Sequence, residues 1–126
     1  MIILSDKPTA YFDVDDTLVM WNFPDEDDKE NVVLVETPDQ GSNLFKFHAE
    51  HVEAIKKYKA RGHNIVVWSA GGSEWASAVI HALNLEKFVD AIMPKPTWFY
   101  DDLPGKDILK NEDHRYIERE KYLGRQ

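Results

Sequence analysis

The hydrophobic positions of the chain change their period several times, and each change marks a predicted element. A continuous apolar run over residues 64–68 is typical of a parallel strand that is covered on both faces. A shorter run over residues 8–12 predicts a first strand that ends directly before Asp13. We expect two further short strands, over residues 89–93 and 98–100.

Apolar stripes at helical spacing lie between these predicted strands. One stripe predicts a helix over residues 48–61, and Gly62 follows it in the position of a helix-ending glycine. A second stripe predicts a helix over residues 73–84. The stripes consist of Val52, Ile55 and Tyr58 in the first helix and of Trp75, Val79, Ile80 and Leu83 in the second. In the charged tail we expect a third helix, between residues 113 and 123.

The segment between the first strand and the first helix has a different character. Residues 18–31 are polar, with an acidic run over residues 25–28, and we expect them to be irregular. Residues 32–35 and 44–47 predict two strands around a turn-rich stretch. Together the two strands would form a hairpin flap beside the first strand, within an insertion over residues 18–47.

Strands that alternate with helices predict a parallel sheet with right-handed crossovers. A chain of 126 residues has room for one core, so the expected fold class is α/β: a three-layer Rossmann-like parallel sheet in a single domain over residues 1–126. Ligands bind to such sheets beyond the carboxyl ends of the strands. The chemistry-bearing residues that follow the predicted strands are Asp13, Ser69, Lys95, Asp101 and Asp102.

Composition narrows the classes of function. The net charge of −8 argues against a protein that binds the nucleic-acid backbone, although it leaves a small phosphorylated substrate open. The absence of cysteine excludes disulfides, thiolate zinc sites and cysteine nucleophiles, and it fits a reducing cytoplasm. No apolar run is long enough to span a bilayer, and the N-terminus lacks the features of a secretion signal. We therefore expect a cytoplasmic protein without a membrane partner.

Four short motifs occur in a fixed order. Residues 12–18 (Phe-Asp-Val-Asp-Asp-Thr-Leu) match the pattern hydrophobic-Asp-x-Asp-x-Thr and resemble the first signature of the haloacid dehalogenase superfamily. Ser69 at a strand end resembles the second signature, and Lys95 before a proline resembles the third. The paired acids Asp101 and Asp102 resemble the fourth. The resemblance covers about residues 9–110. With an insertion too short for a full cap domain, it implies a small capless phosphatase-like member of the superfamily.

This resemblance implies a magnesium-dependent phosphomonoester hydrolase. Asp13 would bind the metal with one oxygen and attack phosphorus with the other, which gives a phosphoaspartate intermediate. Asp15 would bind the metal through its backbone carbonyl, while its side chain transfers protons. Asp101 or Asp102 would complete the oxygen shell that Mg²⁺ prefers. The expected phosphate-binding residues are Thr17, Ser69, Ala70 and Lys95.

Several residues near these motifs have alternative interpretations. Lys106 could replace Lys95 as the cation that neutralises the phosphate, and Asp107 follows the paired acids later than the family pattern has it. The pattern leaves Asp16 free, so we expect it to cap or to face solvent. Of the remaining residues, we expect His48 and His51 to lie at a solvated helix start without zinc, and Trp21, Trp75 and Trp98 to be packing residues, with Trp21 within reach of a substrate.

The motifs leave several alternative functions open and exclude one. A signalling receiver domain would need an aspartate on a middle strand, and no aspartate lies between Asp39 and Asp90. A catalytically idle binding protein, a phosphotransferase and a polynucleotide-end phosphatase stay open as alternatives. Because a capless site is open, the substrate could be a small phosphorylated molecule or a larger one, or a second subunit of a homo-oligomer could close the site.

Overall fold

A parallel sheet forms the body of the protein in the computed structural model, which describes residues 1–21 and 30–110. Its strand order is β1-β5-β6, with β1 at Thr9–Asp13, β5 at Asn64–Ser69 and β6 at Ala91–Pro94. Register pairs run from Thr9 opposite Asn64 to Asp13 opposite Trp68. The most apolar strand, β5, lies in the middle, because there its side chains are removed from water on both faces.

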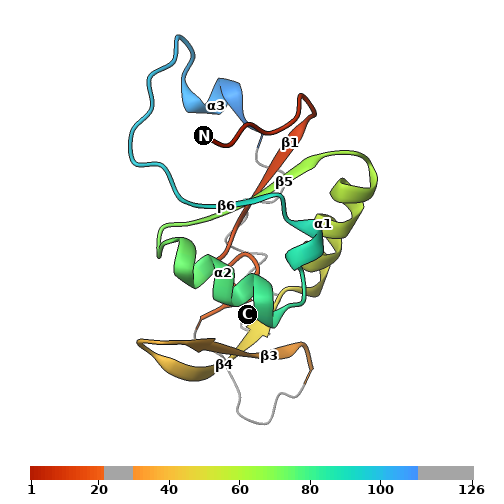
Figure 1. Ribbon diagram of the computed structural model, residues 1–126, viewed down its shortest axis with the longest axis vertical. Coiled ribbons are helices and arrows are strands. Elements are labelled where there is room, and N and C mark those ends of the chain that lie inside the picture. The colour runs from red at the N-terminus through yellow and green to blue at the C-terminus, as the bar shows by residue number, and fades with distance from the viewer. Residues whose placement is uncertain (22–29, 111–126) are drawn as a thin grey trace, which may run out of the picture.

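Both long helices pack against the same face of this sheet (Figure 1). They are α1 at Ala49–Ala60 and α2 at Ser73–Ala82, and a short 3-10 turn, η1 at Glu86–Phe88, precedes β6. The predicted apolar stripes meet alternate side chains of β5 in one core, which contains Val52, Ile55, Ile65, Val67, Ala76, Val79 and Ile80. The predictions of both helices are confirmed. Gly62 has a φ of 89°, the left-handed conformation expected of a helix-ending glycine.

The opposite face of the sheet carries Tyr11 and Trp68, whose ring centroids lie 4.5 Å apart. Among the described residues, the helices that bury side chains all lie on the α1 and α2 face. The described part of the chain therefore supplies two of the three layers that the sequence predicts. The predicted tail helix over residues 113–123 and the acidic run over residues 25–28 lie outside the described residues.

A second, antiparallel sheet lies beside the body, with the strand order β2-β4-β3. The hairpin of β3 (Val32–Thr37) and β4 (Gly41–Phe47) confirms the predicted flap, and in Figure 1 it lies next to α2. The expectation that residues 18–31 are irregular is wrong for β2 (Val19–Met20), which is buried and pairs with Phe47 and Lys46. A strand of two residues is too short to show a hydrophobic period, so no sequence pattern predicts it.

The segment after β6 departs from the prediction. The strand expected over residues 98–100 is wrong: within the described residues this stretch pairs with no strand, and Trp98 and Tyr100 are 86% and 100% exposed. It belongs to a long loop that leaves the sheet and ends in the short helix α3 at Gly105–Ile108 (Figure 1). In the described residues β1 therefore remains an edge strand, which pairs with β5 alone.

Candidate active site

The first motif forms a tight turn at the carboxyl end of β1. The Val14 carbonyl accepts the N–H groups of Thr17, Leu18 and Val19 at 3.2, 2.9 and 3.2 Å. Asp16 has a φ of 59°, a conformation that aspartate tolerates better than most residues. Its carboxylate accepts the Trp21 backbone N–H at 3.0 Å, so it caps the turn, as expected of a residue outside the chemistry.

Asp13 lies at the end of β1 between a hydroxyl and an ammonium group. Its Oδ2 accepts a hydrogen bond from Thr17 Oγ1 at 3.2 Å, and its Oδ1 lies 3.4 Å from Lys95 Nζ. The Lys95 backbone N–H donates to the Ser69 carbonyl at 2.9 Å, which fixes the lysine next to the end of β5. The side chain of Asp13 is 28% exposed, so a ligand can reach its oxygens.

Asp15 lies in the same turn with very different partners. Its Oδ1 accepts the indole N–H groups of Trp21 and Trp75 at 2.8 and 2.9 Å. Its Oδ2 accepts the hydroxyl of Ser69 at 3.2 Å. Three neutral donors therefore hold this carboxylate. Sequence reasoning treated both tryptophans as packing residues, and the closeness of Trp21 to the motif was the one signal that pointed to the site.

The turn after β5 supports this arrangement. Ser69 is fully buried, and its hydroxyl oxygen accepts the Gly71 N–H at 3.0 Å. A Cβ at Gly71 would lie 3.1 Å from Trp75 Cδ1 and 3.3 Å from Ser69 Oγ, so a larger residue here would need these side chains to shift by a few tenths of an ångström. Ala70, a predicted phosphate-binding residue, is exposed in the same turn, directly before α2.

Two histidines at the start of α1, His51 and the N-cap residue His48, contact the backbone of the first motif. His51 Nδ1 lies 2.7 Å from the Thr17 carbonyl, and the His48 N–H donates to the Leu18 carbonyl at 2.9 Å. Their rings are stacked with centroids 3.6 Å apart. The expectation of a solvated helix start is wrong for His48, which is 5% exposed because its ring caps α1 and packs on His51. Sequence reasoning missed this structural role.

The structure does not bring the paired acids to this group. Asp101 and Asp102 are exposed on the loop after β6, away from any strand. The N–H of Leu103 donates to Asp101 at 3.0 Å and, as the largest cause, lowers the pKa of that carboxyl. Lys106 and Asp107 lie on α3, so it is Lys95 that the structure places at Asp13. The role of Asp101 and Asp102 as metal ligands stays a prediction.

A magnesium ion would find oxygen donors at the end of β1. Mg²⁺ keeps several waters and is usually bound by one or two carboxylates together with substrate phosphate. The Asp13 carboxylate and the backbone carbonyl of Asp15 fit that requirement, because they supply oxygen and no nitrogen or sulfur. Across residues 1–21 and 30–110, no group of three histidine, cysteine, aspartate or glutamate side chains stands close enough to hold a metal.

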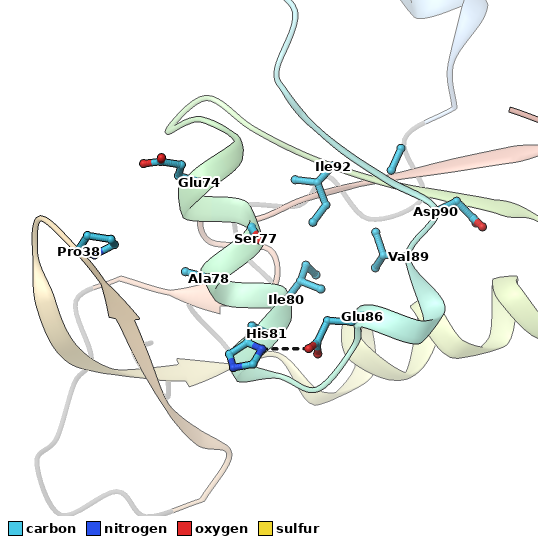
Figure 2. A pocket seen from close by; sticks show the side chains of 11 residues that line it. Pro38, Glu74, Ser77, Ala78, Ile80, His81, Glu86, Val89, Asp90 and Ile92 are labelled. Atoms are coloured by element: carbon cyan, nitrogen blue, oxygen red, sulfur yellow. Dashed lines mark hydrogen bonds and ion pairs between the residues drawn. The ribbon is translucent and has the colours of Figure 1, made fainter. Parts of the chain in front are cut away.

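A separate hollow of about 740 Å³ lies between α2 and β6 (Figure 2). Its floor includes Ile80 and Ile92, and on its rim His81 Nδ1 lies 3.0 Å from a Glu86 carboxylate oxygen. This hydrogen bond is the main cause that lowers the pKa of Glu86. None of the predicted site residues lines the hollow. The candidate chemistry therefore lies at an open rim of the sheet and not in this hollow.

A known protein family matches most of the chain. The model of the NLI interacting factor-like phosphatase family matches residues 8–116. The chain belongs to this family. It is a phosphatase family of the haloacid dehalogenase type, which confirms both the α/β fold class and the resemblance carried by the four motifs. No curated protein matches the chain. None of the helices in the described ranges is long and apolar enough to cross a membrane.

Proposed function

We propose that this phosphatase-family protein is a magnesium-dependent phosphomonoester hydrolase with a phosphoaspartate intermediate on Asp13. The observation that carries the proposal is the position of Asp13 at the end of β1, between Thr17 Oγ1 at 3.2 Å and Lys95 Nζ at 3.4 Å. A nucleophilic carboxylate must approach a phosphate dianion of like charge. Donors that already surround the carboxylate can hold that phosphate in place.

Phosphate binding would use the donors that now meet the carboxylates. The Thr17 hydroxyl and the Lys95 ammonium group would turn to phosphate oxygens, and Ser69 and the N–H of Ala70 would bind from the end of β5. Lys95 would offset part of the negative charge brought together by the phosphate and the two aspartates. Its side chain is 43% exposed, so a phosphate can reach the ammonium group from solvent.

In the first half of the reaction, an Asp13 carboxylate oxygen attacks phosphorus and the bond from phosphorus to the leaving oxygen breaks. Asp15 enters this step protonated and gives its proton to the leaving alkoxide, which departs as an alcohol. The product on the protein is an acyl phosphate of Asp13. The two aspartates differ in their partners, since Asp13 faces the Lys95 ammonium group and a hydroxyl whereas neutral donors hold Asp15.

In the second half, a water molecule attacks the phosphorus of the acyl phosphate and the bond to Asp13 breaks. The ionised Asp15 takes the proton of that water, and inorganic phosphate leaves. Both aspartates then return to their starting states. A magnesium ion held by Asp13 and the backbone carbonyl of Asp15 would supply charge neutralisation for the phosphate during both halves.

The proposed site lies at an open rim of the sheet, so the substrate does not need to fit a long enclosed pocket. We propose a small phosphorylated molecule as the substrate and the cytoplasm as the location, with a second subunit as one way to close the site. An idle binding protein is the competing function of another class. A polynucleotide-end phosphatase is the competing substrate class, and the net charge of −8 disfavours it.

The test is turnover of an aryl phosphate with and without metal. We expect no turnover in EDTA and full recovery on addition of Mg²⁺, with poor activity in Ca²⁺ because its longer, less regular coordination misplaces the reacting oxygens. A screen of phosphorylated metabolites, nucleotides, phosphopeptides and 3′-phosphate oligonucleotides then identifies the substrate class. Full activity in metal-free buffer would contradict the mechanism, and no activity on any of these compounds would favour the idle binding protein.

A further inference from the structure

We infer that Trp21 and Trp75, here called the indole pair, are positioning residues that fix the orientation of the Asp15 carboxylate for the proton-transfer step. The inference rests on the proposed function, because it assigns a task within the same reaction. The indole N–H groups donate to one and the same oxygen, Asp15 Oδ1, at 2.8 and 2.9 Å. Both contacts are well within the range of good N–H to oxygen hydrogen bonds.

The chemical consequence follows from the lone pairs of a carboxyl group. Each carboxylate oxygen offers about two acceptor sites, and the indole pair occupies both sites of Oδ1. Oδ2 is therefore the oxygen that the indole pair leaves open to other partners. It accepts the hydroxyl of Ser69 at 3.2 Å, next to the turn proposed to bind phosphate. The indole pair thus holds Oδ2 toward that turn.

The two donors come from different parts of the fold. Trp21 directly follows β2 in the antiparallel sheet, and Trp75 belongs to α2. Phe45 of β4 fixes both rings, with its centroid 5.0 Å from that of Trp21 and 5.4 Å from that of Trp75. Asp15 is thus oriented correctly only while the antiparallel sheet lies against α2. This arrangement makes the flap part of the proton-transfer machinery although it contributes no acid of its own.

A simpler role for the tryptophans is to stack on a substrate. The N–H edges of both rings point at Asp15, and the ring centroids of Trp21 and Trp75 lie 5.8 Å apart in a tilted arrangement. Phe45 already packs against both rings. Their exposed area can touch a substrate, but the directed hydrogen bonds to Asp15 are explained by positioning and not by stacking.

The geometry can be tested without turnover, by the indole N–H signals in ¹H–¹⁵N NMR spectra. The four tryptophans give four such signals, which single Trp→Phe variants assign. Asp15→Ala removes the acceptor, so we expect the signals of Trp21 and Trp75 to move while those of Trp68 and Trp98 stay. If the signals of the indole pair do not move, the hydrogen bonds do not exist in solution and the inference is overturned.

The positioning role is tested by the dependence on leaving group. Trp75→Phe and Trp21→Phe keep an aromatic ring but lose the donor, and we expect kcat on an alkyl phosphate to fall on the order of 10- to 100-fold. An aryl phosphate needs little protonation, so its kcat should fall much less, with KM little changed for both. Trp68→Phe is the matched control, since it makes the same change on the other face of the sheet and should leave both rates unchanged.

A double variant separates positioning from mere packing. In an Asp15→Asn background proton transfer is already lost, so Trp75→Phe should cost little further activity. Equal losses for alkyl and aryl phosphates, or an undiminished loss in the Asp15→Asn background, would overturn the inference while the proposed function stands. A wild-type protein that hydrolyses no phosphomonoester would overturn the proposed function, and this inference with it.

Discussion

At the carboxyl ends of β1 and β5, side-chain hydrogen bonds join residues far apart in the sequence, whereas the segment over residues 97–110 forms local contacts. Trp75 and Asp15 are 60 positions apart and Lys95 and Asp13 are 82 apart, but Asp101 accepts from Leu103, two positions on. The first region is positioned by a strand ladder and the second is not. Strand pairing fixes where the residues at a strand end lie, and the paired acids Asp101 and Asp102 follow no paired strand in the described residues.

The largest expected effect tests the first region. Asp13→Asn removes the proposed nucleophile and a proposed metal oxygen together, so we expect turnover and phosphoenzyme to vanish. Intact-protein mass measurement after rapid quench, and trapping with a beryllium fluoride phosphate mimic, would detect an adduct on the wild type alone. The matched control is Asp16→Asn in the same turn, which keeps an acceptor for the Trp21 N–H and should stay active. Wild-type turnover by Asp13→Asn would refute the assignment.

Asp15→Asn should have the next largest effect. It keeps the nucleophile and the backbone carbonyl but loses proton transfer, which contributes typically about 10²- to 10⁴-fold in rate. We expect a smaller loss for aryl than for alkyl phosphates and a phosphoenzyme that accumulates, because the attacking water lacks its base. Rapid-quench mass spectrometry measures that accumulation. A uniform loss for all leaving groups would show that Asp15 acts on binding rather than on proton transfer.

The next prediction asks whether the two regions form one site. β1 is an edge strand in the described residues, so its free edge beside Asp13 can accept residues 98–100 as a further strand. In that case we expect Asp102→Asn to raise the magnesium concentration for half-maximal activity by about 10-fold. Asp101→Asn should have a smaller effect, and Asp107→Asn on α3 serves as the control. If neither Asp101→Asn nor Asp102→Asn changes the magnesium requirement, the paired acids are not ligands.

The smallest expected effect is on the free energy of unfolding, and it compares Asp90 with Asp101, two acids whose pKa values are both lowered. A hydrogen bond from Lys59, at 2.7 Å, is the main cause that lowers the pKa of Asp90 from its ordinary 3.8, and the Ile65 N–H adds to it. Because the folded-state pKa is lowered, the ionised Asp90 contributes stability above about pH 4. That contribution is lost as the pH falls through the lower folded-state pKa.

Asp90→Asn should therefore reduce the free energy of unfolding at pH 7 by about 1 kcal/mol, a modest amount because solvent screens the pair. Urea unfolding of both proteins from pH 7 to below pH 4 should show the difference shrinking as the wild-type carboxylate becomes protonated. Asp101→Asn is the comparison, since its bond to Leu103 is local and its loss should leave the unfolding midpoint unchanged. A difference that persists unchanged at low pH would show that charge is not its cause.

Local pattern predicted the parts of the fold that carry strong periods. The strands around residues 8–12 and 64–68, both helices and the hairpin are present, and the order of strands and helices led to the parallel sheet. The strand ends were also expected to bring Asp13 and Lys95 to one rim of the sheet, and Lys95 Nζ lies 3.4 Å from Asp13 Oδ1. These predictions succeeded because the register of a parallel sheet brings the carboxyl ends of neighbouring strands to one edge.

The sequence by itself thus determined the family, the α/β class and the acids at the end of β1, since motif order and period are properties of consecutive residues. Tertiary structure decided what surrounds those acids. The indole N–H of Trp75 reaches Asp15 across 60 positions, and His51 reaches the Thr17 carbonyl across 34, separations that no local pattern encodes. It also decided that residues 98–100 pair with no strand in the described part of the chain, because a short apolar run becomes a strand only when a neighbouring edge takes up its hydrogen bonds.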